Sequence, residues 1–175
     1  MCPAKTTFYS TILLIWLLSS CVDANDYPLT AYRNATDLQF QAAASEDNFD
    51  VLNDGSIAVA GGSPAVRSYA QTLINDRGAA QAELKQIADS VNQVLPQQPE
   101  VGDMDLSLEG MSGFALDTAY LRETLLDQDS AILLYQNEIA NGSYAGLIHY
   151  ANQYLPVMQL RRETADSLLR VLEHP

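Results

Sequence analysis

The sequence predicts an all-α protein, a four-helix bundle with a ferritin-like crossover between its second and third helices. Four stretches of about 25 to 30 residues place apolar side chains at steps of three and four, which is the spacing of one helix face. Short glycine-containing turns separate the first stretch from the second and the third from the fourth. A longer polar link, residues 95–112, separates the two pairs.

The first helix is expected at about residues 36–60. Gly61 and Gly62 end the pattern, and Ser63 and Pro64 suit the cap and the first turn of a following helix. The predicted buried stripe consists of Leu38, Ala42, Ser45, Phe49, Leu52, Ser56 and Val59.

The second helix, expected at about residues 64–94, has the most regular pattern of the four. Its steps alternate between four and three throughout, which is typical of an amphipathic helix in a bundle. The stripe consists of Val66, Ala70, Leu73, Arg77, Ala80, Leu84, Ile87, Val91 and Val94.

The link at residues 95–112 decides how the two helix pairs are connected. It contains Pro96, Pro99, Gly102 and Gly110, which break the helical rhythm. Each helix would be roughly 40 Å long, and this link could span roughly 60 Å when extended. It is therefore long enough to run the length of the bundle, as the single crossover of ferritin-like folds requires, whereas an up-down-up-down bundle needs far less chain there.

The third and fourth helices are expected at about residues 112–140 and 144–172, with Ser143 in the turn between them. Pro156 is expected to kink the fourth helix. The third stripe consists of Leu121, Leu125, Gln128, Ile132, Tyr135 and Ile139. The fourth consists of Ile148, Ala151, Leu155, Met158, Arg162, Ala165, Leu169 and Leu172.

The amino-terminal residues 1–20 are typical of a signal peptide, because their apolar run ends at Leu18 and is too short to span a bilayer. Leu18 to Cys21 (LSSC) resembles the bacterial lipobox, in which the cysteine receives a diacylglyceryl group. We therefore expect a lipoprotein signal peptide, a lipid anchor on Cys21 and a flexible polar tether at residues 21–35. The alternatives are an ordinary signal peptide with a chance cysteine and an uncleaved anchor.

The residues after this signal set the expected location and exclude some partners. Val22 does not resemble the aspartate that retains some lipoproteins in the inner membrane, so we expect an outer membrane lipoprotein that faces the periplasm or the cell surface. From Cys21 onward, 8 basic against 22 acidic residues give a formal charge of −14. This charge repels nucleic acid and anionic lipid headgroups, so no nucleic-acid partner is expected.

Three segments are similar to motifs of a known family. They are residues 73–84, which contain LINDR, Ala80 and Glu83-Leu84; residues 116–120, LDTAY; and residues 155–168, which begin LPVM and contain Ala165 and Leu168. In order and spacing they resemble a bacterial secreted family catalogued as domain of unknown function 4142, over about residues 36–172. The resemblance implies a ferritin-like helical bundle in the periplasm or on the outer membrane, without an established activity.

The departures from this family concern histidines. The family tends to carry one histidine in each of its second, third and fourth helices, and the matching positions here are Arg77, Gln128 and Arg161. A di-iron site of the ferritin type needs Glu-x-x-His pairs, and this sequence has none. Its own histidines, His149 and His174, lie off the apolar stripe and at the end of the chain. We therefore expect no metal and no cofactor.

Inward-facing polar residues form the candidate internal site. Arg77 and Gln128 occupy stripe positions where leucine would be expected, with Arg161 or Arg162 on the fourth helix. A buried arginine must be paired, and the candidate acidic partners are Glu46, Asp76, Asp127 and Asp117. One interpretation is a polar layer that fixes helix register, or arginine stems that reach out to solvent. The other is an internal site for a small anion or carboxylate.

No catalytic residues are assigned, because the sequence lacks a nucleophile elbow, a phosphate-binding loop and a serine–histidine–acid arrangement. We expect a non-enzymatic, lipid-anchored module of the cell envelope that acts through contacts with an envelope protein or in envelope stress. The alternative is a protein that binds a small anion or, less favoured, a metal. An exposed apolar patch would favour the first reading, and a pocket lined by Arg77, Gln128 and Arg161 the second.

Overall fold

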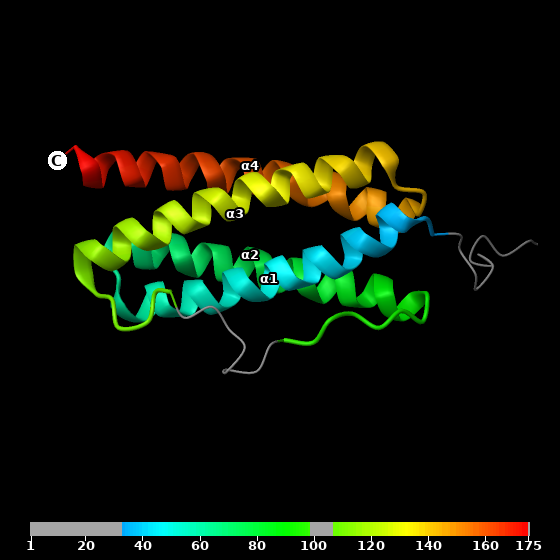
Figure 1. The fold of residues 1–175 in the computed structure, drawn as a ribbon, viewed down its shortest axis with the longest axis horizontal. Coiled ribbons are helices and arrows are strands. Elements are labelled where there is room, and N and C mark those ends of the chain that lie inside the picture. Colours follow the sequence, from blue (N-terminus) through cyan, green and yellow to red (C-terminus); the bar gives the residue numbers. More distant parts are fainter. Residues whose placement is uncertain (1–32, 99–106, 175) are drawn as a thin grey trace, which may run out of the picture.

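The computed structural model describes residues 33–98 and 107–174, which form an antiparallel bundle of four α-helices without strands (Figure 1). The helices are α1 (Ala35–Gly61), α2 (Pro64–Ser90), α3 (Gly113–Asn141) and α4 (Ala145–Glu173). The predicted fold class is confirmed. The largest difference in bounds is at the end of α2, which stops at Ser90 and leaves Val94 81% exposed.

The link between α2 and α3 leaves α2 at one end of the bundle and enters α3 at the opposite end, as the ferritin-like connection requires (Figure 1). It starts at the end of α2, and the backbone carbonyl of Pro96 accepts a hydrogen bond from Ser45 of α1. At the opposite end of the bundle, Leu108 is 1% exposed and belongs to the same apolar cluster as Val66 and Leu116, near the start of α2 and α3. Helices α2 and α3 are therefore parallel, and α1 packs against α3 as α2 packs against α4.

The core consists of two apolar clusters separated by a polar layer. The first contains Val51, Ala58, Val66, Tyr69, Ala70, Leu73, Leu108, Leu116, Tyr120, Leu121, Ala165 and Leu169. The second contains Phe40, Ala44, Ala80, Leu84, Ala131, Tyr135, Leu147, Tyr150, Ala151 and Met158. Along α1, α2 and α3 the boundary between the clusters falls at Asn48, Arg77 and Gln128, all of them buried. The candidate internal site therefore lies in the middle of the bundle.

The predicted buried stripe of α1 is wrong by one position. The buried face carries Asp37, Phe40, Gln41, Ala44, Ser45, Asn48, Val51, Gly55 and Ala58, whereas the predicted Leu38 is 44% exposed. Four members of this face are polar, so the most apolar side of α1 is not the side that faces the core. Hydrophobic periodicity, which locates the buried face of α2, is misleading here because tertiary contacts satisfy most of these polar groups.

A carboxylate from each helix pair caps the second helix of the other pair. Asp37 of α1 accepts hydrogen bonds from the backbone N–H groups of Ser143 and Tyr144, at the start of α4, at 2.9 Å each. Asp117 of α3 accepts one from the N–H of Ser63, at the start of α2, at 2.9 Å. The two caps share a spacing, since Asp117 follows Asp37 by 80 residues and Ser143 follows Ser63 by 80. Each α-hairpin thus supplies the carboxylate that caps the other.

Helix α4 runs as one helix through Pro156. Among the described residues, no helix is both long and apolar enough to cross a membrane.

Candidate functional site

The buried guanidinium of Arg77 is the centre of the polar layer. The side chain is 3% exposed, and its Nη1 atom lies 2.8 Å from the Asp47 carboxylate of α1. Nη1 also donates to Asn48 and Nη2 to Gln128, each at 3.4 Å. The Arg77 guanidinium of α2 thus lies between polar groups of α1 and α3 and contacts both. The pairing with Asp47 compensates the desolvation that a lone buried charge would suffer.

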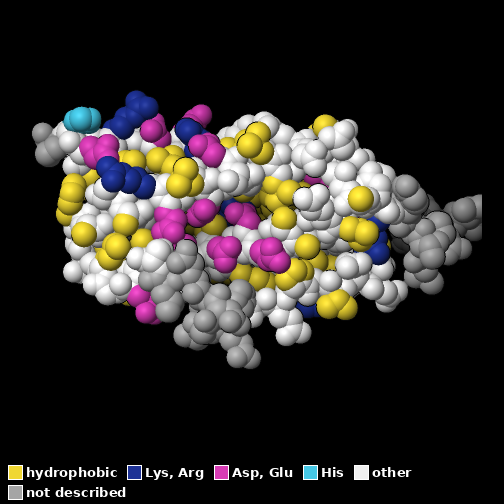
Figure 2. All heavy atoms as spheres, in the orientation of Figure 1, with side chains coloured by type: hydrophobic (Ala, Val, Ile, Leu, Met, Phe, Trp, Pro, Cys, Tyr) yellow, Lys and Arg dark blue, Asp and Glu magenta, His cyan; other side chains and the backbone are white. Residues whose placement is uncertain are grey.

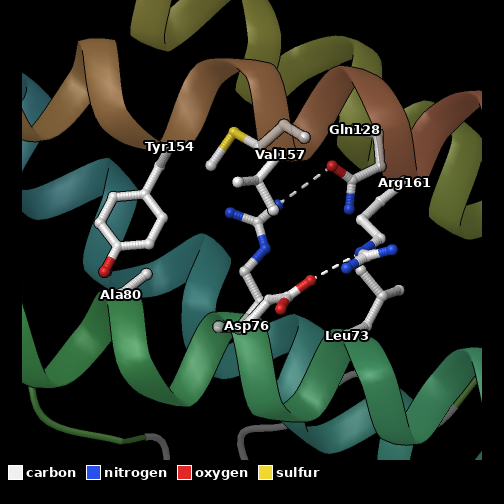
Figure 3. Close-up of a pocket in the computed structure, with 9 residues that line it drawn as sticks. Leu73, Asp76, Ala80, Gln128, Tyr154, Val157 and Arg161 are labelled. Atoms are coloured by element: carbon white, nitrogen blue, oxygen red, sulfur yellow. Dashed lines mark hydrogen bonds and ion pairs between the residues drawn. The ribbon is translucent and has the colours of Figure 1, made fainter.

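A second ion pair closes the layer on the side of α4. The Nε atom of Arg161 donates to Asp76 of α2 at 2.6 Å, and both side chains are about three-quarters buried. Arg77, Gln128, Asp76 and Arg161 line one small cavity, together with Tyr154 and apolar side chains (Figure 3). Its free volume for water is about 10 Å³. This is roughly the space of a single water molecule.

Four of the five predicted internal residues are therefore brought together, and Glu46 is not. Glu46 is exposed on α1, and the adjacent Asp47 occupies the expected position beside Arg77. The reason is the same one-residue error that affects the α1 stripe. Between the two arginines left open by the sequence, Arg161 lines the cavity, while Arg162 forms a more exposed ion pair with Asp129 of α3.

Polar side chains of α1 and α2 extend the layer toward the surface. Asn48 donates from its Nδ2 atom to Gln81 at 3.0 Å, and Gln81 in turn donates to the hydroxyl of Ser45 at 2.8 Å. One donor of the layer, the Nε2 atom of Gln128, is buried without a partner among the described residues. A water molecule in the small cavity that Gln128 lines could satisfy this donor, since buried polar groups are generally bonded to protein or water.

The charges inside the layer are balanced. Two guanidinium groups, of Arg77 and Arg161, face two carboxylates, of Asp47 and Asp76. Burial raises the pKa of Asp47 and the Arg77 charge opposes this effect. The arrangement can fix the register of the four helices, because each charged group would be left unpaired by a slip. For an anion to bind, at least one carboxylate would have to move away from its arginine.

Carboxylates also gather on the surface where α1 meets α3. Figure 2 shows acidic side chains grouped on the face formed by these helices. We call Asp47, Asp50, Asp54, Glu123 and Asp127 the α1–α3 acidic cluster. Burial, then repulsion from Glu123 and Asp127, raises the pKa of Asp54 to about 7. Burial, then repulsion from Asp47 and Glu123, raises the pKa of Asp127 to about 6.

The acidic residues of the described part do not converge on a metal position. No group of three or more histidine, cysteine or acidic side chains in residues 33–98 and 107–174 has a geometry that could hold a metal ion. His149 and His174 are both exposed. Of the acidic partners considered for the arginines, Asp117 instead caps α2, and Asp127 belongs to the α1–α3 acidic cluster.

The predicted lipidation site lies outside the described residues. Cys21, the signal peptide at residues 1–20 and nearly all of the tether at residues 21–35 precede Arg33, the first described residue.

Two buried carboxyl groups at one end of the bundle were not singled out from the sequence. Asp37 and Glu138 are both 0% exposed. Glu138 had no signal of its own, because a glutamate near the end of a helix is usually solvated. For Asp37 a signal existed: with Gln41, Ser45 and Asn48 it forms a polar stripe at steps of four, four and three. Such a stripe indicates a helix face that is polar and buried as readily as one that is solvated.

Comparison with known proteins gives one match. The family model described as "Domain of unknown function (DUF4142)" matches residues 25–168. Neither a curated protein nor a solved structure matches the chain.

Proposed function

The chain belongs to the family described as domain of unknown function (DUF4142), and from this premise we propose that it is a lipid-anchored, non-catalytic module of the cell envelope. In this proposal the bundle acts through its outer surface, in contact with an envelope protein, and its interior serves to hold the four helices in register. A role under envelope stress belongs to the same proposal.

The observation that carries the proposal is the state of the polar layer. Arg77 is paired with Asp47, Arg161 is paired with Asp76, and the cavity between them has room for about one water molecule. Ligand sites normally enclose a cleft of about 300 to 1,000 Å³. The charged groups of the polar layer are thus paired with one another, which favours a function carried out by the outer surface of the bundle.

The outer faces of α3 and α4 offer apolar side chains for such contacts. Leu126 and Leu133 are 70% and 67% exposed, and their spacing of seven residues places them on one side of α3. Leu160 and Val171, 53% and 69% exposed, are eleven residues apart and share one side of α4. Such exposed apolar side chains are the ones that a protein partner would bury.

The lipid anchor is tested on Cys21. In a bacterial host fed an alkyne-labelled fatty acid, the chain is expected to take up label and to fractionate with the outer membrane. Cys21→Ala is the variant, and Cys2→Ala is the matched control because Cys2 lies within the predicted signal peptide. Label on the Cys21→Ala chain, or none on the parent chain, would reject the anchor.

The surface contact is tested separately by photo-crosslinking in intact cells. A photoreactive side chain at position 133 is expected to give a discrete adduct with one envelope protein. The same side chain in place of Arg67, which is exposed on α2, is the control and is expected to give none. Equal patterns from both positions would contradict a specific contact on α3.

A second candidate function, binding of a small anion, is favoured by one observation: Arg77, Gln128 and Arg161 do line a common cavity. Binding would require one arginine to exchange its aspartate for the anion. Titration with phosphate or acetate, followed by the amide signals of the Gln128 side chain, tests it. Saturable shifts that disappear in Arg161→Met would support this function over the first; shifts that follow ionic strength alone would exclude it.

A further inference from the structure

The carboxyl group of Glu138 is buried without a hydrogen-bond donor. It lies in the last turn of α3, is 0% exposed, and neither of its oxygens has a partner among the described residues. The group lies against Gly142, where an added Cβ would be 2.7 Å from its Cδ atom. A buried carboxylate without donors would bear the full cost of lost solvation. Protonation removes most of this cost.

The neighbouring polar group is the carboxylate of Asp37, which accepts four hydrogen bonds from other groups. It receives the N–H of Asn34 at 2.6 Å, the N–H of Ser143 and of Tyr144 at 2.9 Å each, and the hydroxyl of Ser143 at 2.5 Å. Burial raises the pKa of Asp37, but these hydrogen bonds outweigh burial and the pKa is lowered overall. Asp37 therefore remains ionised and joins the start of α1 to the start of α4.

Helix ends place the proton on Glu138 rather than on Asp37. Asp37 lies in the first turn of α1 and at the start of α4, where the partial positive charge of a helix favours an anion. Glu138 lies at the end of α3, where the partial negative charge disfavours one. Burial first, and then Asp37, raises the pKa of Glu138 to about 8. Two carboxyl groups can share a hydrogen bond only when one of them carries a proton.

We propose that Asp37 and Glu138 form a protonation-dependent latch, in which the protonated Glu138 donates to Asp37 and holds the α3–α4 turn against the start of α1. When Glu138 loses its proton to solvent, two buried carboxylates face each other and this end of the bundle opens. The chain that leads to the amino terminus enters the fold at this end, because Asn34 donates to the backbone carbonyl of Asn141 and to the hydroxyl of Ser143. The latch thus couples pH to the junction between the bundle and its amino-terminal segment.

Other charged groups at this end do not neutralise an ionised Glu138. The Arg33 guanidinium donates to Gln41. On α4, Tyr144 is half-buried and His149 is exposed. At the end of α2, Lys85 and Asp89 form an exposed ion pair with each other. The Nε2 atom of Gln41 is a buried donor without a partner among the described residues, but it is uncharged.

The first test follows the ionisation of Glu138 directly. In the full-length chain labelled with carbon-13 in glutamate carboxyl groups, one signal is expected to titrate near pH 8 and to be absent from Glu138→Gln. The glutamine side chain has the same shape and can donate to Asp37 without titrating. Glu46→Gln, on the exposed face of α1, is the matched control and should remove an ordinary titration only. A Glu138 signal that titrates below pH 5 would overturn the latch.

The second test separates a latch from a merely buried acid. Amide hydrogen exchange of Ser143 and Tyr144 is measured from pH 6.5 to pH 9 and corrected for the intrinsic rise of exchange with pH. With a pKa of about 8, the protonated fraction of Glu138 falls from nearly all of the molecules at pH 6.5 to about a tenth at pH 9. Protection in the parent chain is therefore expected to fall about tenfold by pH 9. In Glu138→Gln it should stay within about twofold. Equal loss in both chains would contradict the proposal even if Glu138 titrates near pH 8.

Discussion

The Nη1 atom of Arg77 on α2 lies 2.8 Å from the Oδ2 atom of Asp47 on α1, and the arginine is almost completely buried. This ion pair lies between the two apolar clusters, so it connects halves of the core that are otherwise separate. Replacing both members with apolar groups can leave such a site stable, whereas removing one leaves a buried charge without a partner.

Arg77→Met is therefore expected to lower the free energy of unfolding by about 3 kcal/mol, because Asp47 loses its counter-charge. Urea unfolding followed by circular dichroism at 222 nm measures the change. Arg67→Met on the same helix is the control, and since Arg67 is exposed it should change stability by less than about 0.5 kcal/mol. The double variant Arg77→Met with Asp47→Leu should recover most of the loss; a loss as large as the single variant's would contradict the assignment.

The α1–α3 acidic cluster predicts that the fold is more stable in mild acid than in mild alkali. Asp54 has a pKa of about 7 in the folded chain and 3.8 as its ordinary value. Between these values the folded state holds a proton that the unfolded state has lost, so its contribution to stability is full below pH 3.8 and is lost as the pH rises through 7. Asp127, with a pKa of about 6, acts in the same direction.

The thermal midpoint is thus expected to be higher at pH 5 than at pH 8, by about 3 °C or more. Asp54→Asn should raise the midpoint at pH 8 and leave it nearly unchanged at pH 5, because the carboxyl is already neutral there. Glu163→Gln, an exposed acid on α4, is the control and should not change the slope. A midpoint that rises steadily from pH 5 to pH 8 would contradict the raised pKa values.

Gly142 is expected to be intolerant of a side chain. A Cβ there would lie 2.6 Å from the backbone oxygen of Glu138 and against its carboxyl group. Gly142→Ala should lower the free energy of unfolding by about 1 to 3 kcal/mol, the usual cost of overpacking. Gly78→Ala is the matched substitution within α2, where a Cβ meets no atom within 4 Å. It should stabilise the helix by about 0.5 to 1 kcal/mol. Urea titrations of both variants measure the two changes in the free energy of unfolding, which should have opposite signs.

The cap that α3 provides for α2 gives a further prediction. Asp117→Ala removes the acceptor of the Ser63 N–H and should destabilise the protein by about 1 to 2 kcal/mol. Hydrogen exchange of the Ser63 amide should accelerate more than that of Ser143, whose acceptor is Asp37. Asp117→Asn keeps an oxygen acceptor and should lose less stability. Equal acceleration at both serines would show global rather than local loosening.

The fold was predictable from the sequence because three of its determinants are local. The apolar stripe of α2 matches the buried face from Val66 to Leu84, including the single charged member Arg77. Glycines at the two turns, and the length of the link, constrain the connection of the helices. These signals depend on residues close in sequence and therefore appear without knowledge of the partner helices.

The composition of the polar layer was predictable only in part. Arg77 and Gln128 interrupt apolar stripes, which makes them visible. The partner Asp47 was missed because α1 buries polar residues, so the apolar side of that helix, which includes Leu38, is partly exposed. Periodicity reports where apolar residues are, and it cannot show which polar residues a distant helix will satisfy.

The burial of Glu138 and the partners of the reciprocal caps depend on contacts between distant segments. The hydrogen bonds of Asp37 to Ser143 and Tyr144 join residues more than 100 positions apart. Such pairs depend on how the two hairpins are placed against each other, which follows from packing and not from any one segment.

The crossed caps also constrain the order of folding. As the chain emerges in sequence order, the α1–α2 hairpin is complete while the acceptor for Ser63 lies 54 residues further on, in α3. The later hairpin in turn needs Asp37 from the earlier one. Neither hairpin contains the carboxylate that caps its own second helix. A prematurely ended chain therefore has a helix start whose cap is missing and cannot be supplied by the same hairpin. Contacts between distant positions also slow folding, because the entropy of closing the intervening chain opposes them. Both native caps therefore form only when both hairpins are present.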